Sequence, residues 1–334
     1  MNPFAPHRRY RRALAGLLLA TLAVTALALG SGRYRLDWPA LWAAWPATDT
    51  VGHMVLLDLR LPRVLAALAV GACLAAAGWI FQRMSRNALA SPDIIGLTTG
   101  AATGGLTVIL LMGQRAGAAS ALAVPLGTLA GGLLTVALVY LLSARRGIGG
   151  QWMILAGIAV GALLAAVNDY LLTRADLDDA LAARTWLFGS LQGAGWPQVL
   201  ALLALGTPLL LLAGWQARAL NVLEMGDDLA AALGLPVRRT RLGLLAVAVA
   251  LTGLVIAAAG PIGFVALVAP QLARRLCGGA SRLPAVLLTG ALLCVASDLA
   301  ARTALAPFQI PVGLVTSLLG GAYLAWLLAR EWRS

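Results

Sequence analysis

The stretch from Leu220 to Arg241 reads LNVLEMGDDLAAALGLPVRRTR and forms a polar island between two long apolar runs. Asp227 or Asp228 is expected to cap the start of a short helix, because a side-chain oxygen there can accept orphan backbone N–H groups. Gly234 supplies the left-handed residue that ends this helix, and Pro236 prevents its continuation. The stretch therefore predicts a compact folded segment and not a slack loop.

One face of this predicted helix is apolar. Leu229 and Leu233 are four residues apart, so they share a face that can fill a groove in a partner. Arginines follow at 238, 239 and 241 and mark the cytosolic edge of the next membrane span. A solvated loop is the alternative on the local pattern alone, and the rest of the chain decides between the two interpretations.

The composition of the chain is that of a membrane protein. Of its 334 residues, 60% are hydrophobic and 11% are charged, and the mean hydropathy is +0.87. Soluble domains average about 25% charged residues. The net charge of +12 comes from basic clusters between apolar runs, which is the positive-inside pattern. We therefore expect an all-α integral membrane protein that contacts membrane lipid and has no nucleic-acid partner.

The residue types exclude several kinds of chemistry. All 25 basic residues are arginine. Without lysine the chain has no Walker A loop and no Schiff-base nucleophile, so any ATP and Mg²⁺ must belong to a partner subunit. The cysteines at 73, 277 and 294 lie in or beside apolar runs and lack ligand spacing. We expect no catalytic residue, metal site or cofactor in this chain.

Ten apolar runs follow one another in a single domain that covers residues 1–334. Most approach the ~20 residues that cross a bilayer. The run at 262–272 is shorter and contains Pro270, so hydropathy alone allows either nine or ten spans. The runs are Ala13–Leu29, Val64–Phe81, Ile94–Met112, Ala121–Leu142, Met153–Leu172, Val199–Trp215, Leu242–Ala259, Ile262–Leu272, Pro284–Ala301 and Val312–Leu328.

The arginine distribution favours ten spans. With the amino terminus inside, 17 of the 25 arginines fall on the cytosolic side, which leaves 8 outside. Both termini are then cytoplasmic in a multi-pass protein of the plasma membrane. The first run also resembles a signal peptide, but it exceeds the usual core of about 7–15 residues, so an uncleaved span is favoured. Tryptophans at 38, 42 and 45 predict a helix in the membrane interface.

Further patterns occur in order along nearly the whole chain. They are LRLPR at 59–63 followed by Gly71, Gly78 and Gln82, RNALASPDIIG at 86–96, GPIGFVALVAPQLAR at 260–274, and Asp298 and Arg302 followed by IPVGLVT at 310–316. Together with LNxLxxGxxxAxxLG in the 220–241 stretch, they make the chain similar to the FecCD-like permeases of iron-siderophore and vitamin B12 importers. Those permeases serve ATP-binding cassette (ABC) transporters.

This resemblance implies the partners and the sites. The partners are an ATPase subunit, a substrate-binding protein and a second permease subunit, identical or different. The cargo is a chelate such as a ferric siderophore, haem or a cobalamin. In this family the 220–241 segment sits in a cleft of the ATPase and transmits its closure to the membrane. The residues assigned to this contact are Leu223, Gly226, Asp227, Leu229, Ala230, Leu233 and Gly234.

The chain departs from the family pattern at two places. Asn87-Ala88-Leu89-Ala90 replaces the usual Asn-Pro-Leu-Ala, and Ala266 with Pro270-Gln271 replaces Gly with Pro-His. These changes leave the fold assignment intact, but they weaken any detailed transfer of pore geometry. They would suit one member of a heterodimeric pair.

Arginines at the outer side have two interpretations. Arg60 and Arg63 flank a proline before the second run, where they can be interfacial anchors. The resemblance instead implies that they, with Arg302, receive carboxylates of the binding protein. Asp298 and Arg302 are four residues apart, so they are expected to pair on a helix. Pairing would neutralise a charge that is costly within a span.

Polar residues near the cytosolic span ends are candidates for a gate. These are Gln82, Asn87 and Gln271, together with Pro270. The alternative is that the polar groups satisfy backbone atoms where a helix breaks.

Two other functions are weaker on the sequence. An ion-coupled secondary transporter needs carboxylates near the bilayer midplane, whereas Asp169 and Asp298 lie near span ends. An intramembrane serine protease needs a histidine within the spans, and both His7 and His53 lie outside the predicted ones.

Overall fold

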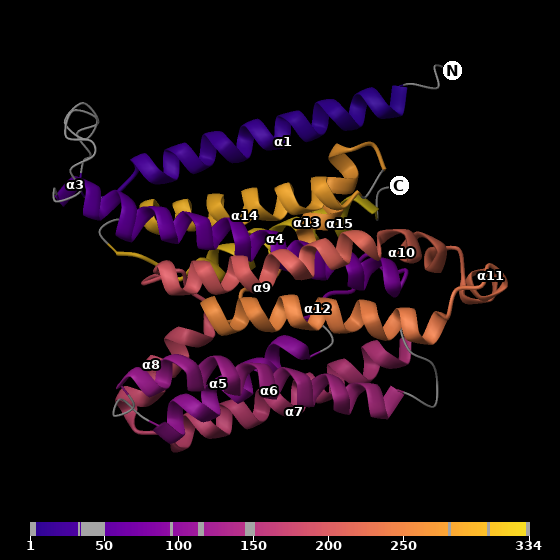
Figure 1. Cartoon of the computed structure of the whole chain (residues 1–334). Coiled ribbons are helices and arrows are strands. Elements are labelled where there is room, and N and C mark those ends of the chain that lie inside the picture. Colours follow the sequence, from indigo (N-terminus) through magenta and orange to yellow (C-terminus); the bar gives the residue numbers. More distant parts are fainter. Residues whose placement is uncertain are drawn as a thin grey trace.

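The computed structural model describes residues 5–32, 34, 51–93, 96–112, 117–143, 151–279, 282–305 and 308–331, and every regular element within these ranges is a helix (Figure 1). The amino-terminal half contains α1 (Ala5–Gly30), α3 (Val51–His53), the π-helix η1 (Met54–Arg60), α4 (Leu61–Met84), α5 (Leu97–Met112), α6 (Gly117–Ser143) and α7 (Gln151–Arg174). The predicted interfacial helix with its tryptophans lies outside the described residues.

The second half begins with the short α8 (Leu177–Leu187) and ends on three helices that pack together. Its other elements are α9 (Trp196–Trp215), α10 (Ala217–Glu224), α11 (Asp227–Ala232), α12 (Val237–Ala259), α13 (Val265–Leu276), α14 (Leu283–Thr303) and α15 (Val312–Glu331).

Each of the ten predicted apolar runs coincides with a helix. In the described part of the chain, seven helices are long and apolar enough to cross a membrane, and α5 and the apolar part of α15 are shorter. The run at 262–272 corresponds to α13, which has only 12 residues. At about 1.5 Å per residue it spans ~18 Å, well short of the ~30 Å hydrocarbon core. This run is helical, but α13 alone covers only part of that distance. Both termini nevertheless lie toward the same end of the bundle, which requires an even number of crossings (Figure 1).

The helix α4 forms the centre of the bundle. It packs against α9, α12, α13 and α14, while α1 lies outside α14, and α5, α6 and α7 form a separate layer beyond α12 (Figure 1). Glycines allow the closest approaches, because a Cβ on Gly71 or Gly290 would overlap the backbone of the other residue. A Cβ on Gly78 would overlap the carbonyl of Ala266 in α13. Close backbone packing of this kind is the van der Waals contact that holds helices together in lipid.

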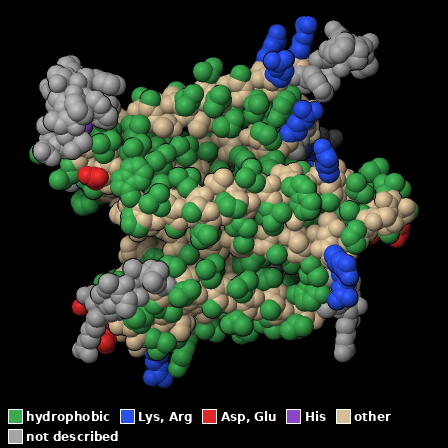
Figure 2. Space-filling model, viewed as in Figure 1, with side chains coloured by type: hydrophobic (Ala, Val, Ile, Leu, Met, Phe, Trp, Pro, Cys, Tyr) green, Lys and Arg blue, Asp and Glu red, His purple; other side chains and the backbone are tan. Residues whose placement is uncertain are grey.

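The two ends of the bundle differ. We call them the α11 end, where α10 and α11 project, and the α3 end opposite. The start of α1 and the end of α15 both lie toward the α11 end (Figure 1). Most of the arginine side chains visible in Figure 2 gather there, between green apolar surfaces. This arrangement agrees with the charge asymmetry expected from the sequence.

Candidate functional site

The short helix predicted within the 220–241 stretch exists as α11 (Asp227–Ala232), but its start differs from the prediction. The residue that caps it is Gly226, at φ 117°, so the expectation of an aspartate cap is wrong. Asp227 and Asp228 instead occupy the first turn, where negative charge favours a helix N-terminus. The chain turns there through a backbone conformation that favours glycine, so no side-chain cap is used.

The end of α11 agrees with the prediction. Gly234 has φ 80°, its N–H donates to the Ala231 carbonyl at 2.9 Å, and the Leu235 N–H donates to the Ala230 carbonyl at 3.0 Å. This pair of bonds is a Schellman motif, which satisfies carbonyls that the helix leaves without a partner. The segment is therefore a closed and compact unit.

Two ion pairs fix this unit to the bundle. Asp227 accepts from the Arg241 guanidinium at 2.6 Å, which joins α11 to the first turns of α12. Glu224 at the end of α10 pairs with Arg83 of α4, and Arg83 also donates to Asn221 at 2.6 Å. The Arg83 guanidinium lies over the Trp79 ring, 4.9 Å from its centroid. The sequence analysis did not find this link, because 141 residues separate Arg83 from Glu224.

The assigned residues divide between the surface and the interior. Leu229 and Leu233 are 44% and 63% exposed, and Met225 beside them is 63% exposed. Leu223 and Ala230 are buried within the chain, so they support the segment and do not contribute to a surface that a partner can reach. Met225 is also four residues before Leu229, but it precedes the residues that were predicted to cap the helix, which is why the sequence analysis did not assign it.

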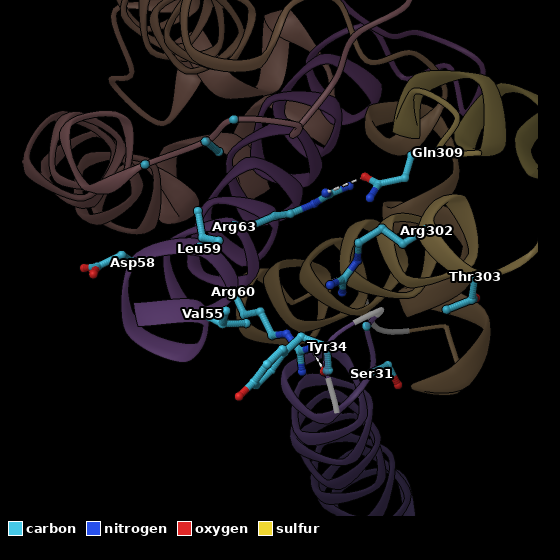
Figure 3. A pocket seen from close by; sticks show the side chains of 14 residues that line it. Ser31, Tyr34, Val55, Asp58, Leu59, Arg60, Arg63, Arg302, Thr303 and Gln309 are labelled. Carbon is cyan, nitrogen blue, oxygen red and sulfur yellow. Dashed lines mark hydrogen bonds between the residues drawn. The ribbon is translucent and has the colours of Figure 1, made fainter. Parts of the chain in front are cut away.

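The α3 end carries a cavity of about 750 Å³. Arg60, Arg63 and Arg302 approach it from three directions, and Tyr34 and Gln309 lie at its edge (Figure 3). The topology thus brings together the three arginines that the sequence analysis had assigned to docking.

A buried carboxylate pairs with two of these arginines. Asp298 is 1% exposed and accepts from Arg63 at 3.0 Å (Nε) and 2.9 Å (Nη2). Arg302 Nε lies 3.1 Å from the other carboxylate oxygen, which confirms the predicted pair four residues apart. Arg63 also donates to Gln309 at 3.1 Å. The contact from Arg63 joins α4 to α14 and was not foreseen.

Arg60 is not the exposed cation that the docking interpretation assumed. It is 6% exposed and donates to the carbonyls of Leu29 at 2.7 Å, Gly30 at 3.1 Å and Tyr34 at 2.5 Å. Its guanidinium therefore satisfies carbonyls at the end of α1, which have no partner within the helix. The assumption of free surface cations is wrong at this position, and the docking role of the three arginines stays a prediction.

The polar candidate gate residues bond to backbone atoms of α13 and of the 85–90 turn. Gln82 donates to the Leu267 carbonyl and Gln271 donates to the Ala88 carbonyl, both at 2.8 Å. Asn87 closes its own turn by accepting from the Leu89 N–H at 2.9 Å. Pro270 is buried inside α13. These contacts fit the alternative in which polar groups satisfy the backbone at a helix break, and a gate stays a prediction.

Asp93 is a half-buried acid to which the sequence analysis gave no role. It accepts from the Thr98 hydroxyl at 2.6 Å and lines a cavity of about 460 Å³ with Ser91 and Ser317. Burial raises the pKa of this carboxyl, while bonds from Thr98 and the Phe264 backbone partly offset the shift. Phe264 begins α13 with φ 67°, which is strained for a residue with a side chain. The sequence analysis recognised the motif at 86–96 that contains Asp93, but a motif alone does not indicate how far a side chain is buried.

Among the described residues, no group of three or more His, Cys, Asp or Glu side chains is placed to hold an ion.

Comparison with known proteins supplies the context for these sites. The model of the FecCD transport family matches residues 18–330. The ferric enterobactin transport system permease protein FepG of Escherichia coli K12 is 44% identical over 324 residues, which are 95% of this chain and 96% of that protein. The hemin transport system permease protein HmuU of Yersinia pestis is 38% identical over 326 residues, 96% of both chains.

A solved structure has the same architecture. It is a metal-chelate type ABC transporter in an inward-facing conformation, with a TM-score of 0.81 and 32% sequence identity. The match covers 96% of this chain and 100% of that one.

Proposed function

Because the chain belongs to the FecCD transport family, we propose that it is the membrane subunit of an ABC importer that carries a ferric siderophore into the cytoplasm. The observation that carries this proposal is the full-length similarity to permeases for ferric enterobactin and hemin, combined with the exposed α11 surface. Haem and cobalamin are the alternative cargoes, since permeases for hemin and for vitamin B12 are also among the relatives.

In this proposal ATP and Mg²⁺ bind to a separate ATPase subunit at the α11 end. Met225, Leu229 and Leu233 present the apolar contact surface, and the Asp227–Arg241 and Glu224–Arg83 pairs carry the movement of the segment into α12 and α4. Packed elements joined by ion pairs are one physical route by which coupling travels between sites.

The opposite end receives the binding protein. The side chains of Arg63 and Arg302 are 13% and 10% exposed at the α3-end cavity, so carboxylates of a docking protein can approach them. A second permease subunit, identical or different, completes the translocation path. The chain lies in the inner membrane with the α11 end and both termini in the cytoplasm, as the gathering of arginines there favours (Figure 2).

The cargo is identified by uptake in cells that lack this chain. Radioactive iron is supplied as a ferric catecholate, hydroxamate, citrate or haem, and labelled cobalamin is supplied separately. We expect uptake of one ferric siderophore to fall to background and to return when the chain is restored. Normal uptake of all these compounds would contradict the proposal, and loss of cobalamin uptake alone would move the cargo to that class.

A further inference from the structure

A groove on the membrane face between α6 and α12 has no role in the function proposed above. Its volume is about 430 Å³, and its thirteen lining residues are glycine or apolar except Tyr140. Leu97, Leu245 and Val249 are buried at its floor, whereas Leu133 on one wall is 59% exposed. The groove is therefore an apolar channel that opens to the surroundings of the bundle.

The length of the groove matches one half of a bilayer. On α12 the lining runs from Leu242 to Gly253, and on α6 it runs from Leu129 to Tyr140. Each wall covers eleven residue steps, which at about 1.5 Å per step give ~16 Å. Half of the ~30 Å hydrocarbon core is ~15 Å. One acyl chain of a phospholipid from a single leaflet therefore matches the groove in length.

The end of the groove nearest α11 carries hydrogen-bond donors. Arg238, one turn before Leu242, is exposed and donates to the Tyr140 hydroxyl at 3.3 Å. A guanidinium has five N–H donors, and a phenol that accepts one bond keeps its own proton to donate. Both groups can therefore reach a phosphate oxygen at the point where the apolar channel meets the membrane surface.

The electrostatics of this end favour an anion. Arg238 and Arg239 stand in the first turn of α12, which contains no acidic residue. The N-terminus of a helix already carries partial positive charge, so basic residues there are unfavourable unless an anion lies nearby. Arg241 has Asp227 as its counter-ion, whereas the partner of Arg238 is the neutral Tyr140.

From this geometry we propose that the α6–α12 groove binds one anionic phospholipid of the leaflet on the α11 side. Its acyl chain lies between the two helices, and its phosphate contacts Arg238 and Tyr140. The bound lipid fills the space between the α5–α6–α7 layer and α12, so it stabilises the contact of that layer with the centre of the bundle.

Native mass spectrometry of the purified full-length chain tests this site. The probes are phosphatidylglycerol and phosphatidylethanolamine with identical oleoyl chains, and glycerol phosphate without chains. We expect retention of one phosphatidylglycerol in preference to the other lipid, and no retention of glycerol phosphate. R238E should weaken phosphatidylglycerol binding about tenfold, as expected for a lost charge-assisted bond. Retention of both lipids without preference by the unaltered chain would overturn the proposal.

Filling the groove supplies a second and independent variant. Ala246 and Ala250 line it without being buried, so A246F with A250F should block both lipids while the helices still form. Matched controls are R218E, an exposed arginine of α10 outside the groove, and A201F, an exposed alanine of α9 outside the groove. Continued retention of phosphatidylglycerol by the double phenylalanine variant would place the lipid elsewhere. Loss of phosphatidylglycerol from the unaltered chain when the second permease subunit is added would show that a protein occupies the groove. Either result would contradict the proposal.

Discussion

Replacing Asp298 by asparagine is expected to remove most of the folded protein from the membrane. The carboxylate is 1% exposed and is shared by Arg63 and Arg302, so its loss leaves two guanidinium charges without their counter-ion. Removing one partner of a buried ion pair costs about 3–5 kcal/mol. Typical stabilities are only about 5–15 kcal/mol. The thermal unfolding temperature of the detergent-purified chain measures this loss.

The controls separate charge from general damage. D58N makes the same chemical change on an exposed residue at the edge of the same cavity and should leave the unfolding temperature unchanged. Adding R63M and R302M to D298N removes the unpaired charges and should recover part of the stability. Normal folding of the D298N chain would contradict the predicted loss of stability. If that chain also takes up its cargo independently of ATP, the result would favour an ion-coupled transporter and contradict our account.

A second large effect is expected when Leu229 and Leu233 are both changed to aspartate. These leucines form the exposed apolar face of the α11 segment, and burying a leucine against a partner contributes about 1.5–3 kcal/mol. Losing both should weaken the ATPase complex on the order of 100-fold or more. Co-purification of the ATPase with the variant, followed by a titration of ATPase binding, measures the change.

A matched pair of leucines serves as the control. Leu177 and Leu181 of α8 have the same spacing and are 75% and 57% exposed, but they lie toward the α3 end (Figure 1). Changing both to aspartate should leave the ATPase bound. If the α11 variant also retains the ATPase at full strength, the segment is not the contact.

Local patterns predicted the elements well. The apolar runs indicated ten helices because a helix in a membrane needs apolar side chains along its whole length. Gly234 indicated the end of α11 because few other residues adopt its backbone angles. The pair between Asp298 and Arg302 followed from helical spacing alone. These features depend on neighbours within a few residues, and such neighbours are visible in a sequence.

Long-range contacts could not be predicted in this way. Arg60 is buried because carbonyls near the end of α1 face it, and those carbonyls come from residues 26 to 31 positions earlier. The second guanidinium on Asp298 comes from Arg63, 235 residues away. Local charge patterns identified these arginines as important but could not distinguish a surface cation from one that closes a helix end.

The most direct test of the central claim is transport by proteoliposomes that contain this chain, its ATPase and its second permease subunit. The loaded binding protein is supplied outside, and accumulation of the labelled ferric siderophore inside is measured with and without enclosed ATP and Mg²⁺. Our account predicts uptake that requires ATP and persists after ion gradients are collapsed, with no ATP hydrolysis by this chain alone. Uptake that an ion gradient drives without ATP, or hydrolysis by the isolated chain, would contradict it.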